Sequence, residues 1–203
     1  MLIHPWDAAQ HDTEWRDWLS THDFGQLIAP GAGRDLPVVV PTHFRYDGER
    51  TVLLHLARPN PVWHALDEHP RALLAVTGDY TYVPAAWNAA EDTDPAQGVP
   101  TSYYAAVHLE CDVRVLDDPA VKAELLNAQL AHFEPGSGRH PVTPDERLLK
   151  GIRGIELTVT AVRAKFKYGG NRSEADRARI SERLRERNGF LDAEARGHLT
   201  RRG

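Results

Sequence analysis

The segment LLHLARPNPVW, residues 53–63, brings together three side chains that can hold an anion. His55, Arg58 and Asn60 follow an apolar run, and two prolines restrict the backbone that presents them. A guanidinium suits a phosphate because it donates two parallel hydrogen bonds, and backbone amides at a helix start add to such a site. The structural alternative is that Arg58 caps a strand end while Asn60 satisfies a turn. This segment taken alone favours the structural alternative.

Other reactive residue types give weaker signals. The eleven histidines form neither an HExxH motif nor a zinc spacing, so we expect no metal site, although His43, His55 and His108 fall on expected strands and could converge. The only cysteine, Cys111, has an acidic residue on each side, which disfavours a thiolate. There is no G-x-S-x-G, no G-x-G-x-x-G after a strand and no Walker loop, so serine-hydrolase and nucleotide-binding chemistry are not indicated.

The elements that must position these residues are mostly strands. Period-two patterns and turn residues predict six strand regions, the fourth broken near Gly78, at 24–29, 36–46, 50–57, 71–83, 102–116 and 154–168. Helical spacing and capping signals predict helices at 13–22, 60–69, 118–133 and 173–189. Pro41 indicates an edge strand or a bulge, and the acidic segment 87–101 is expected to be a surface loop. The pattern predicts an α+β protein, mostly β, with an antiparallel barrel and helical decoration.

Composition and charge are those of a globular protein. The 203 residues suit one domain with an appendage, no segment is apolar enough to cross a membrane, and the first residues lack the order of a signal peptide, so a cytoplasmic protein is expected. Residues 163–203 carry 12 Lys and Arg against 6 Asp and Glu, a net charge of +6, whereas the whole chain carries −5. Because Glu182 and Glu186 are interleaved with the arginines, we expect the basic helix to pack on the body or a partner subunit rather than to read DNA.

Five separated blocks together resemble one family, the PaiB-type negative transcriptional regulators of the FMN-binding split-barrel superfamily. In chain order they are FGQLIA with VVVPTHF, LLHLARPNPVW, GDYTYVPAAW, VPTSYYAAVH, and LLKGIRGIELTVTAVRAKFKYGGNRSEAD. The blocks span residues 24–176, and five in register are more specific than any one alone. This chain departs from the family pattern at Ala85-Ala86, where hydroxyls are missing, and at Gly169-Gly170, which replace a more ordinary pair.

The resemblance implies a six-stranded antiparallel split β-barrel with Greek-key character, over residues 1–172, and a basic C-terminal helix and tail over 173–203. It also implies a homodimer with FMN at the dimer interface. The phosphate would lie at His55, Ala57, Arg58 and Asn60, and Thr42 and His43 would face the isoalloxazine or the ribityl chain. The remaining expected contacts, which would come from the other subunit or close the pocket, are Trp87, Tyr103, Lys165, Asn171 and Arg172.

Three further functions compete with an FMN-binding regulator. A flavin-dependent oxidoreductase or flavin reductase could use the same barrel, because the flavin itself supplies the redox chemistry. A haem-binding split barrel would need a strand histidine such as His43 or His108 as the axial ligand. A DNA binder that uses the basic helix and has no cofactor is the fourth. The FMN-binding regulator itself could bind DNA directly or through another protein.

Overall fold

The computed structural model describes residues 1–89 and 93–201. The chain divides into two compact units, each assembled from separate stretches of sequence. The first unit contains Met1–Glu14, Thr77–Val107 and Arg163–Gly203, and the second contains Trp15–Val76 and His108–Val162. This division by packing does not test the expected domains 1–172 and 173–203, which stay a prediction.

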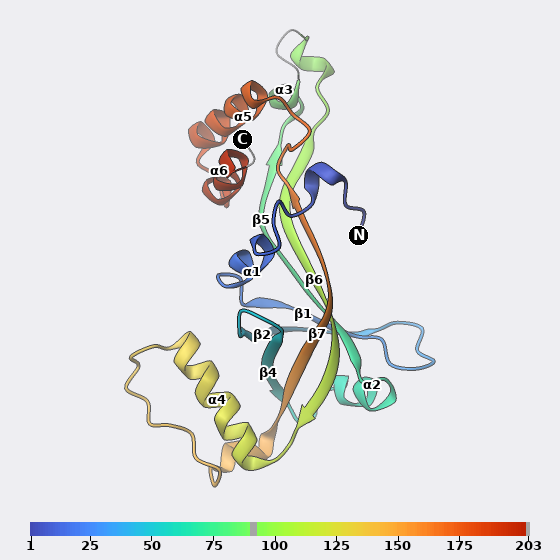
Figure 1. Cartoon of the computed structure of the whole chain (residues 1–203), viewed down its shortest axis with the longest axis vertical. Coiled ribbons are helices and arrows are strands. Elements are labelled where there is room, and N and C mark those ends of the chain that lie inside the picture. The colour runs from blue at the N-terminus through green and yellow to red at the C-terminus, as the bar shows by residue number, and fades with distance from the viewer. Residues whose placement is uncertain (90–92, 202–203) are drawn as a thin grey trace. The chain divides into compact units, whose positions relative to one another are not determined.

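Seven strands form one sheet in the order β2-β1-β5-β6-β7-β4-β3 (Figure 1). Their bounds are β1 Phe24–Ala29, β2 Val38–His43, β3 Arg45–Tyr46, β4 Thr51–Ala57, β5 Arg71–Val83, β6 Thr101–Leu116 and β7 Ile152–Lys167. The pairs β1–β2, β1–β5, β3–β4 and β4–β7 are antiparallel. β2 lies at one end of the order, so Pro41 is on an edge strand, as its missing N–H predicts.

The expected count of six strands is wrong, because the expected strand at 36–46 divides at Phe44. The Phe44 side chain is fully buried, and its backbone N–H donates to Asp23 O rather than to a strand partner. β2 before it pairs with β1, and β3 after it pairs with β4. The two ends of the strand order are therefore consecutive in the chain, and within the described residues the sheet is not closed into a barrel.

The second unit has the expected alternation of apolar side chains. β4 buries every second residue, including Val52, Leu54 and Leu56. Helices α1 (Glu14–Leu19), α2 (Val62–Glu68) and α4 (Pro119–Phe133) cover this part of the sheet, and the Asp118 carboxylate caps α4 by accepting from two backbone N–H groups. A short 3-10 helix, η3 (Arg147–Gly151), leads into β7.

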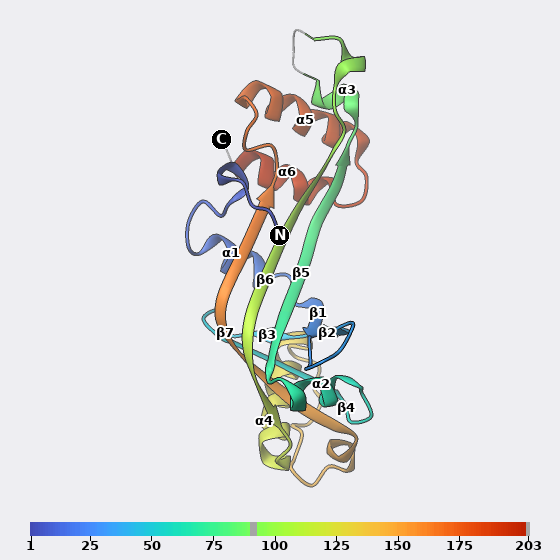
Figure 2. The ribbon, with the colours of Figure 1, turned by 90° about the vertical axis from the view of Figure 1, so that its right-hand side faces the viewer.

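The first unit contains the C-terminal helices, which lie side by side in both ribbon views (Figures 1 and 2). Ser173 caps α5 (Glu174–Arg187) as predicted. The expectation of one C-terminal helix followed by a tail is corrected, because a second helix, α6 (Asp192–Arg201), follows α5 after a tight turn. The turn uses positive φ at Asn188 and Leu191, and leucine gives no sequence signal for that conformation. The expected break near Gly78 is also wrong, because β5 continues through Asp79 at φ 50°.

Three short elements complete the first unit: η1 (Pro5–Asp7), α3 (Ala85–Asn88) and η2 (Pro95–Gln97). The loop expected at 87–101 includes residues 90–92, which lie outside the described residues; its described part contains the end of α3 and η2. No helix in the described part of the chain is long and apolar enough to cross a membrane.

Candidate functional site

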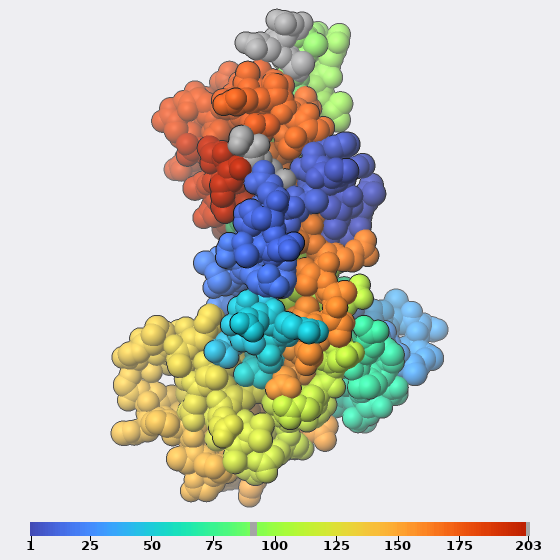
Figure 3. Space-filling model, in the orientation of Figure 1, coloured from blue at the N-terminus to red at the C-terminus, as the bar shows by residue number. Residues whose placement is uncertain are grey.

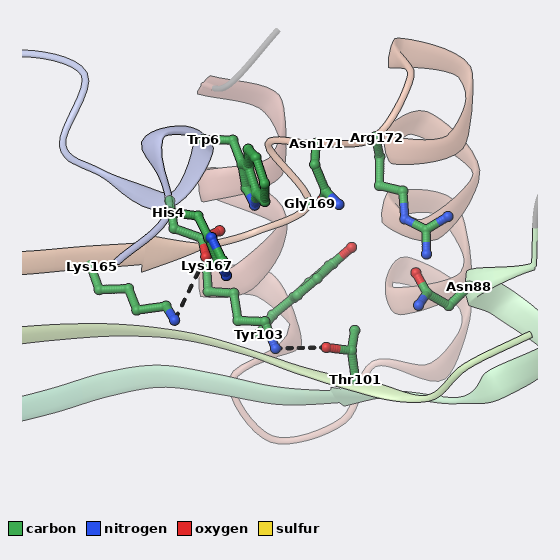
Figure 4. A pocket seen from close by; sticks show the side chains of 11 residues that line it. His4, Trp6, Asn88, Thr101, Tyr103, Lys165, Lys167, Gly169, Asn171 and Arg172 are labelled. Atoms are coloured by element: carbon green, nitrogen blue, oxygen red, sulfur yellow. Dashed lines mark hydrogen bonds and ion pairs between the residues drawn. The ribbon is translucent and has the colours of Figure 1, made fainter. Parts of the chain in front are cut away.

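A pocket of about 330 Å³ in the first unit gathers four of the residues expected to bind a cofactor: Tyr103, Lys165, Asn171 and Arg172 (Figure 4). We call it the cationic pocket. Its walls come from η1 and the residues before it, the end of α3, the start of β6, the end of β7 and the turn that follows. The other lining residues are His4, Trp6, Asp7, Asn88, Thr101, Lys167 and Gly169.

The cations of this pocket differ in how they are paired. Lys165 and Lys167 lie two residues apart on β7 and therefore share a face. Lys165 Nζ donates to Leu2 O at 2.9 Å and lies 3.6 Å from the Asp7 carboxylate, whereas within the described part of the chain Lys167 Nζ donates only to the neutral Thr101 hydroxyl, at 2.8 Å. Burial, followed by repulsion from Lys165, lowers the pKa of Lys167. The Arg172 guanidinium makes no hydrogen bond or ion pair with a described residue, so it is available to a ligand.

Two buried uncharged groups also face this pocket without partners. Tyr103 is 2% exposed and Asn88 is 7% exposed, yet Tyr103 Oη and Asn88 Oδ1 have no hydrogen-bond partner among the described residues. Burial raises the pKa of Tyr103 to about 12, so at neutral pH the phenol keeps its proton and can donate it. An unsatisfied buried polar group costs roughly 1–3 kcal/mol, so both atoms point to a group that binds here.

Gly169 and Gly170 shape the cationic pocket, which accounts for their place in the sequence. A Cβ on Gly169 would lie 2.7 Å from Tyr103 Oη, and its φ of 68° disfavours any other residue. A Cβ on Gly170 would lie 2.1 Å from the Trp6 carbonyl oxygen. The departure from the family pattern at this pair therefore lies where the turn after β7 comes close to the Trp6 backbone and the Tyr103 side chain.

A second pocket, of about 700 Å³, lies in the second unit and is mainly apolar. It contains three expected site residues, Thr42, His43 and His55, together with Phe24, Pro41, Leu126, Gln129, Leu130, Phe133 and Glu134. We call it the apolar pocket. The His43 ring packs edge-on against Phe24 and Phe133, with centroid distances of 4.9 and 5.4 Å. Neither ring nitrogen of His43 bonds to a described residue, whereas His55 Nδ1 lies 2.6 Å from Gln129 Oε1.

The strand-end cluster Ala57, Arg58 and Asn60 lines neither pocket. Arg58 donates two hydrogen bonds to Asp117, at 2.9 and 2.5 Å, and Asn60 Oδ1 accepts from Val62 N. The Arg58 guanidinium, with help from Lys122 and Arg153, holds the pKa of the Asp117 carboxyl well below its usual range. The charge of Arg58 is thus already compensated within the chain. Its expected role toward a phosphate stays a prediction.

Trp87, the last expected site residue, also lines neither pocket. The Arg187 guanidinium lies 4.9 Å from the centre of its ring, and its neighbour Asn88 is the residue that reaches the cationic pocket. Sequence reasoning missed Asn88, Thr101 and the segment from His4 to Asp7, for which no periodic pattern exists. The alternation of basic residues on β7 was the available signal for Lys167.

The structure also bears on two other kinds of chemistry, that of the cysteine thiol and that of metal binding. Burial, followed by the charge of Asp112, raises the pKa of Cys111 to about 12, in agreement with the expectation that it is not a nucleophile. No group of three or more His, Cys, Asp and Glu that could hold a metal ion occurs in residues 1–89 and 93–201.

Comparison with known families places residues 1–161 in one of them. They match the sequence pattern of the family described as "Putative FMN-binding domain". No functionally curated protein matches the chain.

Comparison with solved structures shows the fold. The flavocytochrome Anf3 from Azotobacter vinelandii superposes with a TM-score of 0.64 at 22% identity, over 85% of this chain and 75% of that one. The FAD and haem binding protein from Mycobacterium smegmatis superposes with a TM-score of 0.62 at 20% identity, over 84% of this chain and 78% of that one. At these identities the likeness concerns the fold alone.

Proposed function

The chain belongs to the family described as "Putative FMN-binding domain", and from that premise we propose that it is an FMN-binding protein of the PaiB type that acts as a homodimer, with the cationic pocket as its phosphate site. The observation that carries the site assignment is the set of unpartnered groups in this pocket. Among the described residues, Arg172 and Lys167 have no carboxylate partner, and Tyr103 Oη and Asn88 Oδ1 have no hydrogen-bond partner.

These groups fit the phosphate end of FMN chemically. A phosphate monoester carries a charge of about −1.5 to −2 at neutral pH, and it offers only acceptor oxygens to its partners. Lys167, Arg172 and the protonated Tyr103 hydroxyl are all donors, and donors that carry a charge give the strongest such bonds. Asn88 Oδ1 is an acceptor and would suit a ribityl hydroxyl. A bound flavin would supply redox chemistry, while these residues bind it and orient it.

The regulator role is part of the proposal, but the basic helix α5 argues against direct reading of DNA. Each of four arginines on α5 forms an ion pair with a nearby carboxylate, in the pairs Arg179–Asp176, Arg183–Glu186, Arg185–Glu182 and Arg187–Asp192. Cations that are already paired contribute less to phosphate binding. We therefore propose that regulation acts through another protein rather than through α5 on DNA. A gel shift with purified protein that weakens steeply with salt would contradict this.

Fluorescence quenching of FMN by purified protein tests the site. We expect Arg172→Ala to weaken FMN binding by at least tenfold and Tyr103→Phe by about fivefold, since one hydrogen bond contributes about 1 kcal/mol. Arg183→Ala, on the exposed face of α5, is the matched control and should change nothing. A loss of affinity in Arg58→Ala, with Arg172→Ala unchanged, would instead put the phosphate at the end of β4. Size exclusion with and without FMN tests the homodimer.

The rate of NADH or NADPH oxidation distinguishes a regulator from an enzyme. The FMN-loaded protein should not oxidise NADH or NADPH faster than free FMN does. Steady oxidation of either nucleotide would identify a flavin oxidoreductase or flavin reductase instead.

Haem binding in the apolar pocket is a second candidate function, favoured by one observation. His43 presents an imidazole with no hydrogen bond to a described residue, in an apolar pocket of about 700 Å³ between two phenylalanines. A neutral imidazole nitrogen is a common axial ligand of haem iron. Titration with haemin should then give a Soret band that His43→Ala shifts and His108→Ala leaves unchanged, because His108 lines neither pocket. A band that is insensitive to His43→Ala would reject this assignment.

A further inference from the structure

Residues 1–7, which we call the strap, lie across the end of β7 and hold one wall of the cationic pocket. The backbone carbonyls of Met1 and Leu2 accept hydrogen bonds from Arg163 and Lys165, and Ala8 forms an isolated β-bridge with Lys165. Within the strap, the His4 and Trp6 rings stack with centroids 4.7 Å apart. Figure 3 shows the strap, in dark blue, on the molecular surface beside the orange segment that contains the end of β7.

Asp7 is the one carboxylate among the described residues that line this pocket, and it is held loosely. Its residue is only 3% exposed, but the nearest cation, Lys165 Nζ, lies 3.6 Å from Oδ2, beyond the length of a hydrogen bond (the dashed line from Lys165 in Figure 4). A buried carboxylate usually has several close donors, because removing its water is costly. Asp7 has lost most of its water without gaining a short hydrogen bond to its cation.

The charges of the lining residues bear on whether a ligand can replace Asp7 beside Lys165. Among the described lining residues, Lys165, Lys167 and Arg172 contribute three positive charges against one negative charge from Asp7. A phosphate monoester carries a charge of about −1.5 to −2, which exceeds the single charge of Asp7, so it competes with Asp7 for the ammonium group of Lys165. Lys165 and Lys167 share one face of β7, and their ammonium groups lie 5.7 and 6.0 Å from the centre of the Tyr104 ring. A phosphate oxygen that bonds to Lys165 Nζ would take the place of the Asp7 carboxylate, which lies 3.6 Å from it.

We propose that Asp7 is a specificity-determining residue that competes with the ligand phosphate for Lys165, and that phosphate binding releases the strap from β7. This inference rests on the proposed phosphate site and adds its selectivity and its regulation. A ligand must bring enough negative charge to displace Asp7, so a phosphorylated flavin is accepted and an uncharged one gains nothing from the site. Phosphate binding then changes the position of the strap. The Leu2 and Trp6 side chains of the strap are exposed, so a partner protein can detect this change.

Affinity measurements on Asp7→Asn provide the first test, with Asp12→Asn as a control carboxylate that is exposed and outside the pocket. Asparagine keeps the shape and removes the competing charge. We expect Asp7→Asn to bind FMN at least about tenfold more tightly, because one like charge a few ångströms away near a protein surface opposes binding by at least that factor. Riboflavin affinity should stay the same in both variants, because riboflavin carries no phosphate.

Hydrogen exchange of the wild-type chain provides a second test that needs no variant. The backbone N–H groups of Asp7 and Ala8 both donate to His4 O, so they report on the folded strap. We expect them to exchange faster when FMN saturates the protein. Unchanged FMN affinity in Asp7→Asn, or slower exchange of these amides with FMN bound, would each overturn the proposal.

Inorganic phosphate separates this proposal from the proposed function. If neither the wild type nor Asp7→Asn binds FMN, the proposed FMN function is wrong, and titration with inorganic phosphate then tests whether Asp7 competes with phosphate. Tighter phosphate binding by Asp7→Asn than by the wild type and Asp12→Asn would support this competition. Absence of phosphate binding in all three proteins would overturn it as well.

Discussion

The Asp192 carboxylate, at the start of α6, is the clearest place to test how the C-terminal helices are anchored. The residue is 2% exposed, and it accepts two hydrogen bonds from Arg187, at 2.8 and 2.6 Å, one from the Thr81 hydroxyl at 2.6 Å and one from Gly189 N at 2.8 Å. Arg187, followed by Thr81 and Gly189, lowers the pKa of Asp192 from 3.8 to about 2. This network ties α5 and α6 to β5.

The size of the effect follows from the pKa. Since each pKa unit corresponds to about 1.4 kcal/mol, a carboxyl that changes this much on folding stabilises the folded state by about 2 kcal/mol at neutral pH. Because the folded-state pKa is lowered, this stabilisation is present above about pH 4 and is lost as the pH falls toward 2. Asp192→Asn should therefore lower the free energy of unfolding by about 2 kcal/mol at pH 7.

Urea denaturation followed by circular dichroism measures this difference. The gap between the wild type and Asp192→Asn should shrink from about 2 kcal/mol at pH 7 to a small fraction of this at pH 2, where about half of the wild-type carboxyl groups in the folded protein are protonated. Glu182→Gln is the control, because its ion pair with Arg185 is exposed and such pairs contribute little. A gap that does not depend on pH, or one no larger than that of Glu182→Gln, would refute the reasoning.

Three further predictions concern single residues. Gly169→Ala should lower the free energy of unfolding by roughly 1–3 kcal/mol, because its φ of 68° and its contact with Tyr103 Oη leave no room for a methyl group; a thermal melt of equal midpoint would contradict this. Cys111, with a pKa of about 12, should not react with a thiol reagent at pH 8 until urea unfolds the protein, so rapid labelling of the native protein would be inconsistent with its burial. Phe44→Ala should lower the free energy of unfolding by about 3–5 kcal/mol in urea titrations, since the ring is fully buried, and a loss below 1 kcal/mol would show that β2 and β3 do not depend on it.

Local patterns in the sequence were sufficient for most elements of the fold. The strands at 24–29, 50–57 and 102–116 were expected almost to the residue, because alternation of apolar side chains depends only on neighbours in the chain. The division of the strand at Phe44 was not foreseen, since it depends on which partner each half finds. The helix α6 was missed because its turn places a leucine at positive φ.

The candidate site was harder to predict, because its members meet only in the folded chain. Arg58 looked free beside a helix start, yet its partner Asp117 lies 59 residues further along the chain. Tyr103, Lys165, Asn171 and Arg172 were suggested by the family resemblance, and they do share a pocket. Asp7 and Asn88 gave no local signal, since their position depends on how the strap and α3 pack.

The division of one extended segment at Phe44 has a consequence for the order of folding. β1 with β2, and β3 with β4, are two hairpins closed by short connections, so each should form early and without the other. The partners that join them to the rest of the sheet are distant: Leu54 pairs with Ile155, about a hundred residues away. Closing such a long loop costs chain entropy before it gains contacts, so the pairing of β4 with β7 should be among the last steps. Because Phe44 links the two hairpins, we expect their relative geometry to be set before that step. β7 would then pair with a β4 edge that has already formed.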